Sequence, residues 1–338
     1  MSTALLTLRV RALTWEAEGI LGIELVPLQP NTLLPAFEAG AHIDLHLPGT
    51  GSATHPPDAG SGPHIRSYSL LNAPGERQRY CIAVNLDAAS RGGSRWIHEQ
   101  LRCGQTLTVG APRNNFPLNE AAPLSVFFAG GIGITPILGM IRRLEAIGRP
   151  WRLHYATRSA IHAAYVSELQ ALSEAGQAGG RDGALDLHVD ADRGRVLDIA
   201  GLIAALPAGT HVYCCGPLGM LGAFEAATAA LPREQVHLEY FAAKEAAATD
   251  GSYVVELARS GRTVPVQPGR TLLESLEGAG VEVLYSCREG ICGTCEVKVL
   301  AGTPDHRDLV LSEAERAANN RIMVCCSGAK TPKLVLDL

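Results

Sequence analysis

Three things that this sequence lacks narrow the classes of protein it can represent. Its first residues show no positively charged stretch followed by an apolar one and a cleavage site, so we expect no secretory leader and a cytoplasmic protein. Nine cysteines are an odd number, which argues against the paired disulfides of a secreted domain. The 29 Lys and Arg residues do not exceed the 34 carboxylates, so the basic excess typical of nucleic-acid binding is missing.

Charge is also missing from residues 123–141, a stretch long enough to span a membrane. Gly130, Gly131 and Gly133, followed by Pro136, divide it instead into an apolar strand, a tight turn and the start of a helix. We therefore expect the opening of a nucleotide-binding α/β domain here, and no membrane association.

Four cysteines near the end of the chain form the most specific pattern in the sequence. Cys287, Cys292 and Cys295 are spaced as C-x4-C-x2-C, and Cys325 follows after twenty-nine further residues. This is the ligand spacing of plant-type [2Fe–2S] clusters. Structural zinc usually takes its ligands as two short-spaced pairs, so a zinc site fits less well, and cysteines with a purely structural role are the other alternative.

Cys326 makes the fourth ligand ambiguous, because it stands next to Cys325. Adjacent residues on an extended segment point to opposite sides, so only one of the two would face the iron. The ferredoxin-like spacing favours Cys325. Gly290 and Gly293 in the cysteine loop let backbone N–H groups approach the cluster sulfurs.

The sequence predicts a multidomain protein, because its periodicity changes along the chain. Residues 1–120 contain short strands separated by Gly and Pro, which predicts an antiparallel β-barrel. Residues 121–242 alternate apolar strands with helices, which predicts an α/β domain with a parallel sheet. The polar, alanine-rich residues 243–251 are a predicted linker, and residues 252–338 predict an α+β domain of β-grasp type.

Individual elements are also expected from these patterns. The four strands expected in the parallel sheet are 124–130, 151–157, 184–190 and 210–216. In the last domain, a hairpin turning at Ser260 and Gly261 precedes a helix that Thr271 and Glu274 open as a capping box. Residues 281–286 are expected to form the strand that leads into the cysteine loop. The charged run 305–308 is expected to be an exposed turn, with partner docking as the alternative.

Short motifs in the first two domains suit cofactor phosphates. The sequence AGGIGITP at 129–136 follows the first strand of the α/β domain, where backbone amides at a helix N-terminus can bind a pyrophosphate. CGP at 215–217 follows the fourth strand. The barrel region contains RSYS at 66–69, AVN at 83–85 and RGGS at 91–94. A Gly-Gly-Ser turn can direct backbone N–H groups at a phosphate, and a plain hairpin turn is its alternative interpretation.

Through these motifs and the cysteine spacing, the chain resembles the phthalate dioxygenase reductase family, which includes the vanillate O-demethylase reductases. The resemblance covers essentially the full length and implies a flavin-binding barrel, an NAD-binding domain and a plant-type ferredoxin domain. The residues that it implies for flavin binding are Arg66, Ser67, Tyr68, Ser69, Ala83, Val84, Asn85, Arg91, Gly92, Gly93, Ser94 and a terminal aromatic. That aromatic is either Tyr240 or Phe241, with Phe241 favoured. Those that it implies for the nucleotide are Gly130, Gly131, Gly133, Thr135, Thr157, Arg158, Asp190, Cys215, Gly216 and Pro217, with Thr135 and Cys215 catalytic at hydride transfer.

The charge at the end of the third strand favours NADH over NADPH. NADPH-dependent relatives carry Ser-Arg there, whereas this chain has Asp190, Ala191 and Asp192. A carboxylate repels the 2′-phosphate and accepts hydrogen bonds from ribose hydroxyls. Arg158 and Arg193 lie nearby in the sequence, and their positive charges keep NADPH as an alternative donor. For the flavin, the family implies FMN, with FAD the less favoured alternative.

The function implied by the resemblance is an NADH-dependent reductase component of a Rieske-type aromatic oxygenase or demethylase. Electrons would pass from NADH to FMN, then to the cluster, and then to a separate terminal oxygenase. No C-x-H pair with a second C-x2-H is present, so the Rieske centre is expected on another chain. The alternatives are a reductase for another acceptor, such as a diiron monooxygenase, and a non-enzymatic ferredoxin-like carrier or redox sensor. We expect a monomer.

Overall fold

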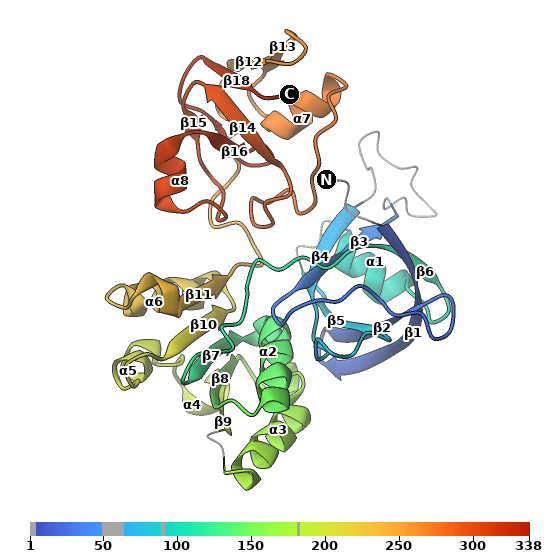
Figure 1. Ribbon diagram of the computed structural model, residues 1–338, viewed down its shortest axis with the longest axis vertical. Helices are drawn as coiled ribbons and strands as arrows, with labels where there is room; N and C mark the ends of the chain where they lie inside the picture. Colours follow the sequence, from blue (N-terminus) through green and yellow to red (C-terminus); the bar gives the residue numbers. More distant parts are fainter. Residues whose placement is uncertain (1–4, 49–63, 89–91, 181–182) are drawn as a thin grey trace. The chain divides into compact units, whose positions relative to one another are not determined.

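The computed structural model describes residues 5–48, 64–88, 92–180 and 183–338. These divide into two compact units, Met1–Glu239 and Tyr240–Leu338. The first unit contains an antiparallel sheet and a parallel sheet, and the second contains a smaller mixed sheet (Figure 1). None of the helices in the described ranges is both long and apolar enough to cross a membrane. The multidomain fold class predicted from the sequence is confirmed.

The antiparallel sheet of the first unit has six strands in the order β4-β3-β6-β1-β2-β5. The strands are β1 (Leu5–Ala17), β2 (Ile20–Pro27), β3 (His42–Leu47), β4 (His64–Ser69), β5 (Tyr80–Asn85) and β6 (Thr106–Gly110), and helix α1 (Gly93–Gln100) follows β5. The edge strands β4 and β5 also contact each other, so the sheet curls into the expected barrel. Leu25, Ile43, Leu45 and Tyr80 are fully buried in its core.

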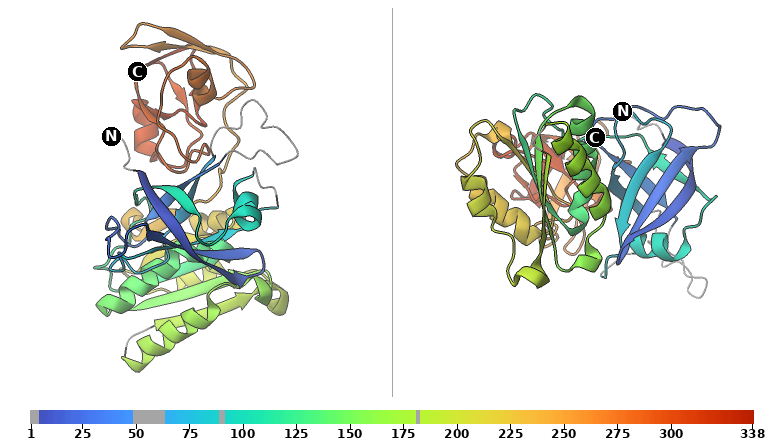
Figure 2. Two further views of the ribbon diagram at one scale, coloured as in Figure 1. Left: turned by 90° about the vertical axis from the view of Figure 1, so that its right-hand side faces the viewer. Right: turned by 90° about the horizontal axis from the view of Figure 1, so that it is seen from below.

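The second sheet of the same unit is parallel, with the order β11-β10-β7-β8-β9. Its strands are β7 (Ser125–Gly130), β8 (Trp151–Thr157), β9 (Gly183–Val189), β10 (His211–Cys215) and β11 (Val236–Glu239). The connecting helices are α2 (Ile134–Ile147), α3 (Val166–Ala178), α4 (Asp190–Arg193), α5 (Ile199–Ala204) and α6 (Leu218–Thr228). The helices α2 and α3 cover one face of the sheet and α5 and α6 the other (Figure 2). The four predicted strands are confirmed, and β11 is an addition.

The strand order creates a switch point in the middle of the parallel sheet. The chain starts at β7, continues outward through β8 and β9, and then crosses back to β10 on the other side of β7. The connections that leave β7 and β10 therefore diverge to opposite faces. Open α/β sheets bind ligands at the carboxyl ends of the strands at such a point. This edge is where the site residues from both motifs of the parallel-sheet domain are placed.

The second unit contains a five-stranded mixed sheet in the order β13-β12-β18-β14-β16. Its strands are β12 (Tyr253–Leu257), β13 (Thr263–Val266), β14 (Glu296–Ala301), β16 (Arg321–Met323) and β18 (Lys333–Leu336), with β15 (Pro304–Asp305) paired to β17 (Gly328–Ala329). Helices α7 (Leu272–Gly278) and α8 (Glu313–Ala318) complete it. Leu272, Leu273 and Leu276 bury one face of α7 in the core of the unit. The predicted capping box is present, with Thr271 and Glu274 bonding each other's backbone N–H groups.

One expectation for this unit was wrong. None of residues 281–286 is in a strand, although their burial alternates along the chain. Both sides of β14, the strand that follows the cysteine loop, are already occupied, because β14 pairs with β18 on one side and with β16 on the other. An alternating segment becomes a strand only where a neighbour offers hydrogen-bond partners.

The segment predicted as a linker also makes contacts within the second unit. Ala248 donates its backbone N–H to the Cys326 carbonyl at 2.8 Å, and the Thr249 carbonyl accepts from Gly269 at 2.8 Å. The division between the compact units falls earlier, after Glu239. The linker boundaries 243–251 stay a prediction.

Candidate functional site

The carboxyl edge of the parallel sheet gathers residues from four strands. Gly130 ends β7, Thr157 ends β8 and Cys215 ends β10. Cys215 lies opposite Glu239, the last residue of β11. Asp190 follows directly after β9 and begins α4. The sequence placed four of these five residues in one nucleotide site, and the sheet brings them to one edge.

The glycine turn and the CGP segment are packed against each other with almost no space between their backbones. A Cβ atom on Gly133 would lie 2.1 Å from the Cys215 carbonyl oxygen, and one on Gly130 would lie 2.5 Å from Cδ of Pro217. A Cβ on Gly216 would lie 2.7 Å from Sδ of Met220. Only glycine allows this approach, and it explains why two motifs so far apart in sequence occur together.

The two predicted catalytic residues are both enclosed. Thr135 lies in the first turn of α2, is 3% exposed, and donates its hydroxyl to the Ile132 carbonyl at 3.0 Å. Cys215 is fully buried. Burial raises the pKa of its thiol well above the ordinary 9.0, and Glu239 and Cys214 add to the effect. A thiol that stays protonated is no nucleophile, so Cys215 suits a positioning role.

Three buried oxygens at this edge have no hydrogen-bond partner among the described residues: Thr157 Oγ1, Asp190 Oδ1 and Glu239 Oε2. Buried polar atoms are nearly always paired, so such atoms mark places where a ligand group can bind. A ring nitrogen of His188 lies 3.4 Å from Asp190 Oδ1. Arg158, which is exposed, accepts from the Ala191 N–H through its carbonyl at 3.1 Å. Hydroxyl-rich ribose and a carboxamide match this set of donors and acceptors.

Glu239 was missed as a site residue by the sequence reasoning. Burial raises the pKa of its carboxyl to about 8. A carboxylic acid that is protonated at neutral pH can donate a hydrogen bond, which an ordinary carboxylate cannot. Its only sequence signal is its place two residues before the expected terminal aromatic Phe241.

The barrel brings the RSYS motif together with the start of α1. A Cβ on Gly93 would lie 3.0 Å from Nε of Arg66. The N-cap residue Gly92 has a φ of 102° and provides no side-chain cap. A guanidinium beside a helix N-terminus is a suitable site for a phosphate. Ser94 accepts from the Asp87 N–H at 3.2 Å, and Arg91 lies outside the described residues.

Hydrogen bonds to residues outside the RSYS motif hold Ser67 in place. Ser67 donates its hydroxyl to Asp44 Oδ1 at 2.7 Å, and Arg113 donates to Asp44 Oδ2 at 2.6 Å. Burial and the nearby Arg113 lower the pKa of His42 to about 4, so this ring stays neutral. Tyr68 also stays protonated, because burial raises the pKa of its phenol. The sequence reasoning missed Asp44 and Arg113, which no local motif connects.

The AVN segment lies where the barrel meets the parallel-sheet domain within the first unit. Ala83 and Val84 are buried and Asn85 is exposed. Strand β5, which carries all three, contacts the turn at Gly131–Gly133. The predicted flavin and nucleotide motifs therefore adjoin.

The four predicted cluster ligands are buried free cysteines in the second unit. The Cys287 thiol lies within hydrogen-bonding reach of the thiols of Cys292 and Cys325. Glu289 donates its backbone N–H to Cys287 Sγ at 3.3 Å. No three His, Cys, Asp or Glu side chains in the described ranges are grouped as ligands of a single metal ion. A [2Fe–2S] cluster differs from such a site, because four thiolates share two irons.

Cys325 and Cys326 lie in a turn, not on the extended segment that the sequence suggested. Both side chains are buried. Cys326 Sγ is directed at the Met323 carbonyl and the Ser327 hydroxyl, at 3.8 and 3.7 Å, and a Cβ on Gly290 would lie 2.4 Å from it. These contacts leave Cys325 as the thiol next to Cys287. The choice of Cys325 as fourth ligand stays a prediction.

The run 305–308 is not the exposed turn that was expected. Asp308 is 1% exposed and accepts from the N–H groups of Val310 and Leu311 at 3.0 and 2.8 Å. Leu309 donates its N–H to the Gly290 carbonyl at 2.8 Å. This segment therefore supports the cysteine loop from behind. Phe241 belongs to the second unit and is 37% exposed, so its place beside the flavin stays a prediction.

Family models of known domains match two stretches of this chain. Residues 127–226 match the family model of the oxidoreductase NAD-binding domain, and residues 255–330 match that of the 2Fe-2S iron-sulfur cluster binding domain. Phenoxybenzoate dioxygenase subunit beta from Ectopseudomonas oleovorans is 50% identical and is matched over 98% of this chain and 97% of its own length. Tetrachlorobenzoquinone reductase from Sphingobium chlorophenolicum is 49% identical over 97% of both chains.

Solved structures also resemble the chain over nearly its whole length. Phthalate dioxygenase reductase, described as a modular structure for electron transfer from pyridine nucleotides to [2Fe-2S], is 36% identical with a TM-score of 0.72, and 99% of this chain covers 98% of it. An intact type IV self-sufficient cytochrome P450 monooxygenase is 39% identical with a TM-score of 0.81 over 99% of this chain. The chain spans 41% of the length of that second protein.

The fold and its three sites define an NADH-dependent flavin iron–sulfur oxidoreductase. Such enzymes join a hydride donor to a one-electron acceptor. Within that class, the chain belongs to the phthalate dioxygenase reductase family.

Proposed function

We propose that this protein is the reductase component of a multicomponent, Rieske-type aromatic oxygenase or demethylase and delivers electrons to a separate terminal oxygenase. The observation that carries the proposal is the match to a dioxygenase subunit over nearly the full length of both chains. One chain contains all three cofactor sites, so a monomer in the cytoplasm suffices for the relay.

The residues present fit the implied cofactors. Arg66 and the first turn of α1 would hold the flavin phosphate, with Ser67 fixed by Asp44. FMN suits a site with one phosphate position. When bound, the flavin supplies the exchange between a two-electron donor and a one-electron acceptor. Cys287, Cys292, Cys295 and Cys325 would hold the cluster.

In the nucleotide site, each residue has a separate task. The turn 130–133 and the N-terminus of α2 bind pyrophosphate. The unpartnered oxygens of Asp190 and Thr157 accept hydrogen bonds from the ribose hydroxyls. Asp190 also disfavours a 2′-phosphate, which supports NADH as the donor. Cys215 and Thr135 orient the nicotinamide and exclude water from it, because both are buried.

A second candidate function is direct reduction of a quinone. It is favoured by the 49% identity to a tetrachlorobenzoquinone reductase, nearly equal to that of the dioxygenase subunit. The two functions share the same relay and differ in the acceptor. Oxygen uptake with purified candidate oxygenases separates them from quinone reduction, measured with NADH and a chlorinated benzoquinone under nitrogen.

The relay itself is tested by removing cluster ligands. In Cys292→Ser and Cys325→Ser, NADH should still bleach the flavin absorbance, while cytochrome c reduction falls by at least ten-fold. Cys326→Ser is the matched control, and it should keep both activities because its thiol faces Met323 and Ser327. Retained cytochrome c reduction in Cys292→Ser would show that the cluster is not in the path. A wild-type protein without flavin would exclude the proposal in favour of a plain carrier.

A further inference from the structure

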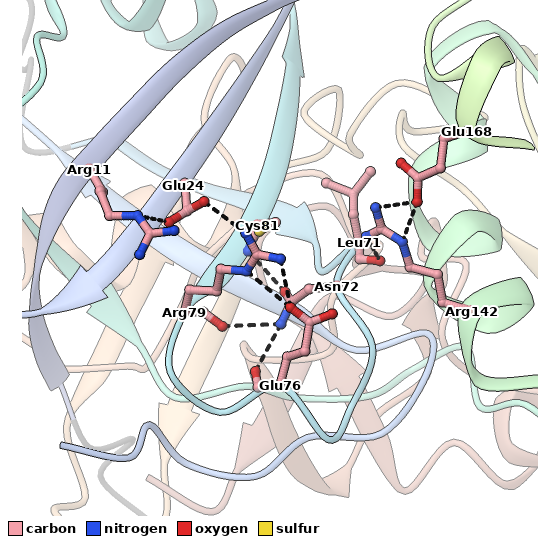
Figure 3. Close-up of polar contacts among 9 residues, drawn as sticks. All are labelled: Arg11, Glu24, Leu71, Asn72, Glu76, Arg79, Cys81, Arg142 and Glu168. Carbon is pink, nitrogen blue, oxygen red and sulfur yellow. Dashed lines mark hydrogen bonds and ion pairs between the residues drawn. The ribbon is translucent and has the colours of Figure 1, made fainter. Parts of the chain in front are cut away.

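One face of α2 lies directly on the backbone of the barrel. Thr135, Gly139 and Arg142 are spaced i, i+4 and i+7, so they share that face. A Cβ on Gly139 would lie 2.7 Å from the Leu70 carbonyl oxygen. Arg142 donates Nη1–H to the Leu71 carbonyl at 2.5 Å (Figure 3). The helix that carries Thr135 at its start is thus fixed to the barrel one and two turns later.

The barrel segment that α2 contacts is itself immobilised. Leu70 and Leu71 donate their N–H groups to the carbonyls of Ala41 and Cys81, at 2.8 and 2.9 Å. The buried Asn72 amide donates to the Arg79 carbonyl at 3.1 Å and accepts from the Cys81 N–H at 2.9 Å. Figure 3 shows this amide in the same loop that ends at Arg79. The segment also follows directly after Arg66–Ser69, the predicted flavin motif.

Arg142 is oriented by a third element. Its Nε donates to Glu168 Oε1 at 2.7 Å, and its Nη2 lies 2.5 Å from the same oxygen. Glu168 is in the first turn of α3. The Arg142 side chain is 22% exposed, so solvent screens this ion pair less than it screens a surface pair. The guanidinium therefore joins α2, α3 and the barrel.

We propose that Gly139 and Arg142 are positioning residues for hydride transfer, which set the distance between the flavin held by the barrel and the nicotinamide held at the start of α2. This rests on the proposed function. Gly139 is only about 6 Å along the helix axis from Thr135, so a displacement at Gly139 is transmitted to the predicted catalytic residue. The transfer moves one hydride, which is two electrons and a proton, from C4 of NADH to the flavin and leaves NAD⁺. A misplacement of about 1 Å can slow such a step by roughly 100-fold.

The test compares four single variants of the full-length, flavin-loaded protein. Arg142→Met keeps the length but loses the hydrogen bonds, Arg142→Lys restores a charge, and Gly139→Ala pushes on the Leu70 carbonyl. Arg143→Met is the matched control. It removes an equivalent arginine from the same helix, but one that pairs with Glu120 and not with the barrel strands.

Stopped-flow reduction with NADH should show a limiting rate at least ten-fold lower in Arg142→Met and Gly139→Ala, with KM and flavin affinity within about two-fold of wild type. Arg142→Lys should recover part of the rate, and Arg143→Met should match wild type. Hydrogen exchange at residues 70–72 and in α2 should rise in Arg142→Met only. Dithionite-reduced variants should pass electrons to cytochrome c normally, which shows that they are folded.

Unchanged limiting rates in Arg142→Met and Gly139→Ala would overturn the inference. So would an equal loss in Arg143→Met, or a loss that only follows flavin release. If Arg142→Met does not fold, Arg142→Lys and Gly139→Ala decide the question. If NADH fails to reduce the flavin of wild type, the proposed function fails instead, and the exchange data still report whether Arg142 holds α2 to the barrel.

Discussion

Burial of Glu239 at the end of β11 raises the pKa of its carboxyl to about 8, from an ordinary value of 4.5. Between these values the unfolded chain loses the proton and the folded chain keeps it. The contribution of Glu239 to stability is therefore present below pH 4.5 and is lost as pH rises toward 8.

We predict that Glu239→Gln is increasingly more stable than wild type as pH rises from 5 to 8, since glutamine cannot ionise. Thermal unfolding of the flavin-loaded protein at fixed ionic strength measures this. A stability difference that does not change with pH would contradict it. At the same time, NADH oxidation by the variant should lose its pH dependence near 8.

At this same scale, the sequence revealed contiguous motifs and missed residues that only the fold unites. RSYS and CGP could be recognised because their residues are neighbours in the chain. Asp44 and Arg113 lie far apart in sequence. An isolated β-bridge between His42 and Arg113 brings the Arg113 guanidinium to the Asp44 carboxylate on β3. No short sequence motif predicts a pair of residues that are so far apart in the chain.

The cysteine loop also leaves almost no space at one of its glycines. Gly290 has a φ of 72°, and a Cβ there would meet Cys326 Sγ at 2.4 Å and Cα of Asp308 at 3.1 Å. Gly280 has a similar φ of 69° but open space around it. Alanine at Gly280 would therefore introduce backbone strain alone, whereas alanine at Gly290 would introduce backbone strain and a steric clash.

We predict that Gly290→Ala loses most of its cluster, whereas Gly280→Ala keeps it and loses only about 1–2 kcal/mol of stability. Iron content, visible absorbance of the cluster and thermal unfolding check this. Equal cluster occupancy in both variants would show that the Cys326 contact is not limiting.

The element scale also explains which strands the sequence could show. β7 and β10 are buried on both faces and appear as continuous apolar runs. β11 is a four-residue edge strand whose side chains are all half-buried, so it has neither a run nor an alternation. Residues 281–286 alternate but have no ladder partner. The hydrophobic pattern of a segment indicates which of its side chains are buried. Whether the segment pairs as a strand depends on a neighbouring strand with unpaired backbone groups.

For the whole molecule, the division after Glu239 predicts that the first half of the relay survives without the second unit. A chain of residues 1–242 should bind flavin and reduce ferricyanide with NADH at a rate within about three-fold of the whole protein. It should not reduce cytochrome c through the cluster. Loss of ferricyanide reduction would show that the second unit is needed for the hydride step.

The variant Phe241→Ala of the 1–242 chain tests the predicted role of Phe241, because a chain that ended at Glu239 would also lose Tyr240. Flavin affinity should fall relative to the unsubstituted 1–242 chain if this aromatic covers the ring. Equal affinity in the two chains would exclude that role.

The covalent joint between the two units has a consequence for engineering. Glu239 lies beside Cys215 in the nucleotide site, and the next residue already belongs to the cluster-bearing unit. Anyone who exchanges ferredoxin modules among relatives to redirect electrons must therefore keep Glu239 with the first unit. A junction placed a few residues earlier would replace Glu239 in the nucleotide site by a residue of the relative. An altered rate could then come from the changed nucleotide site as well as from the new electron acceptor.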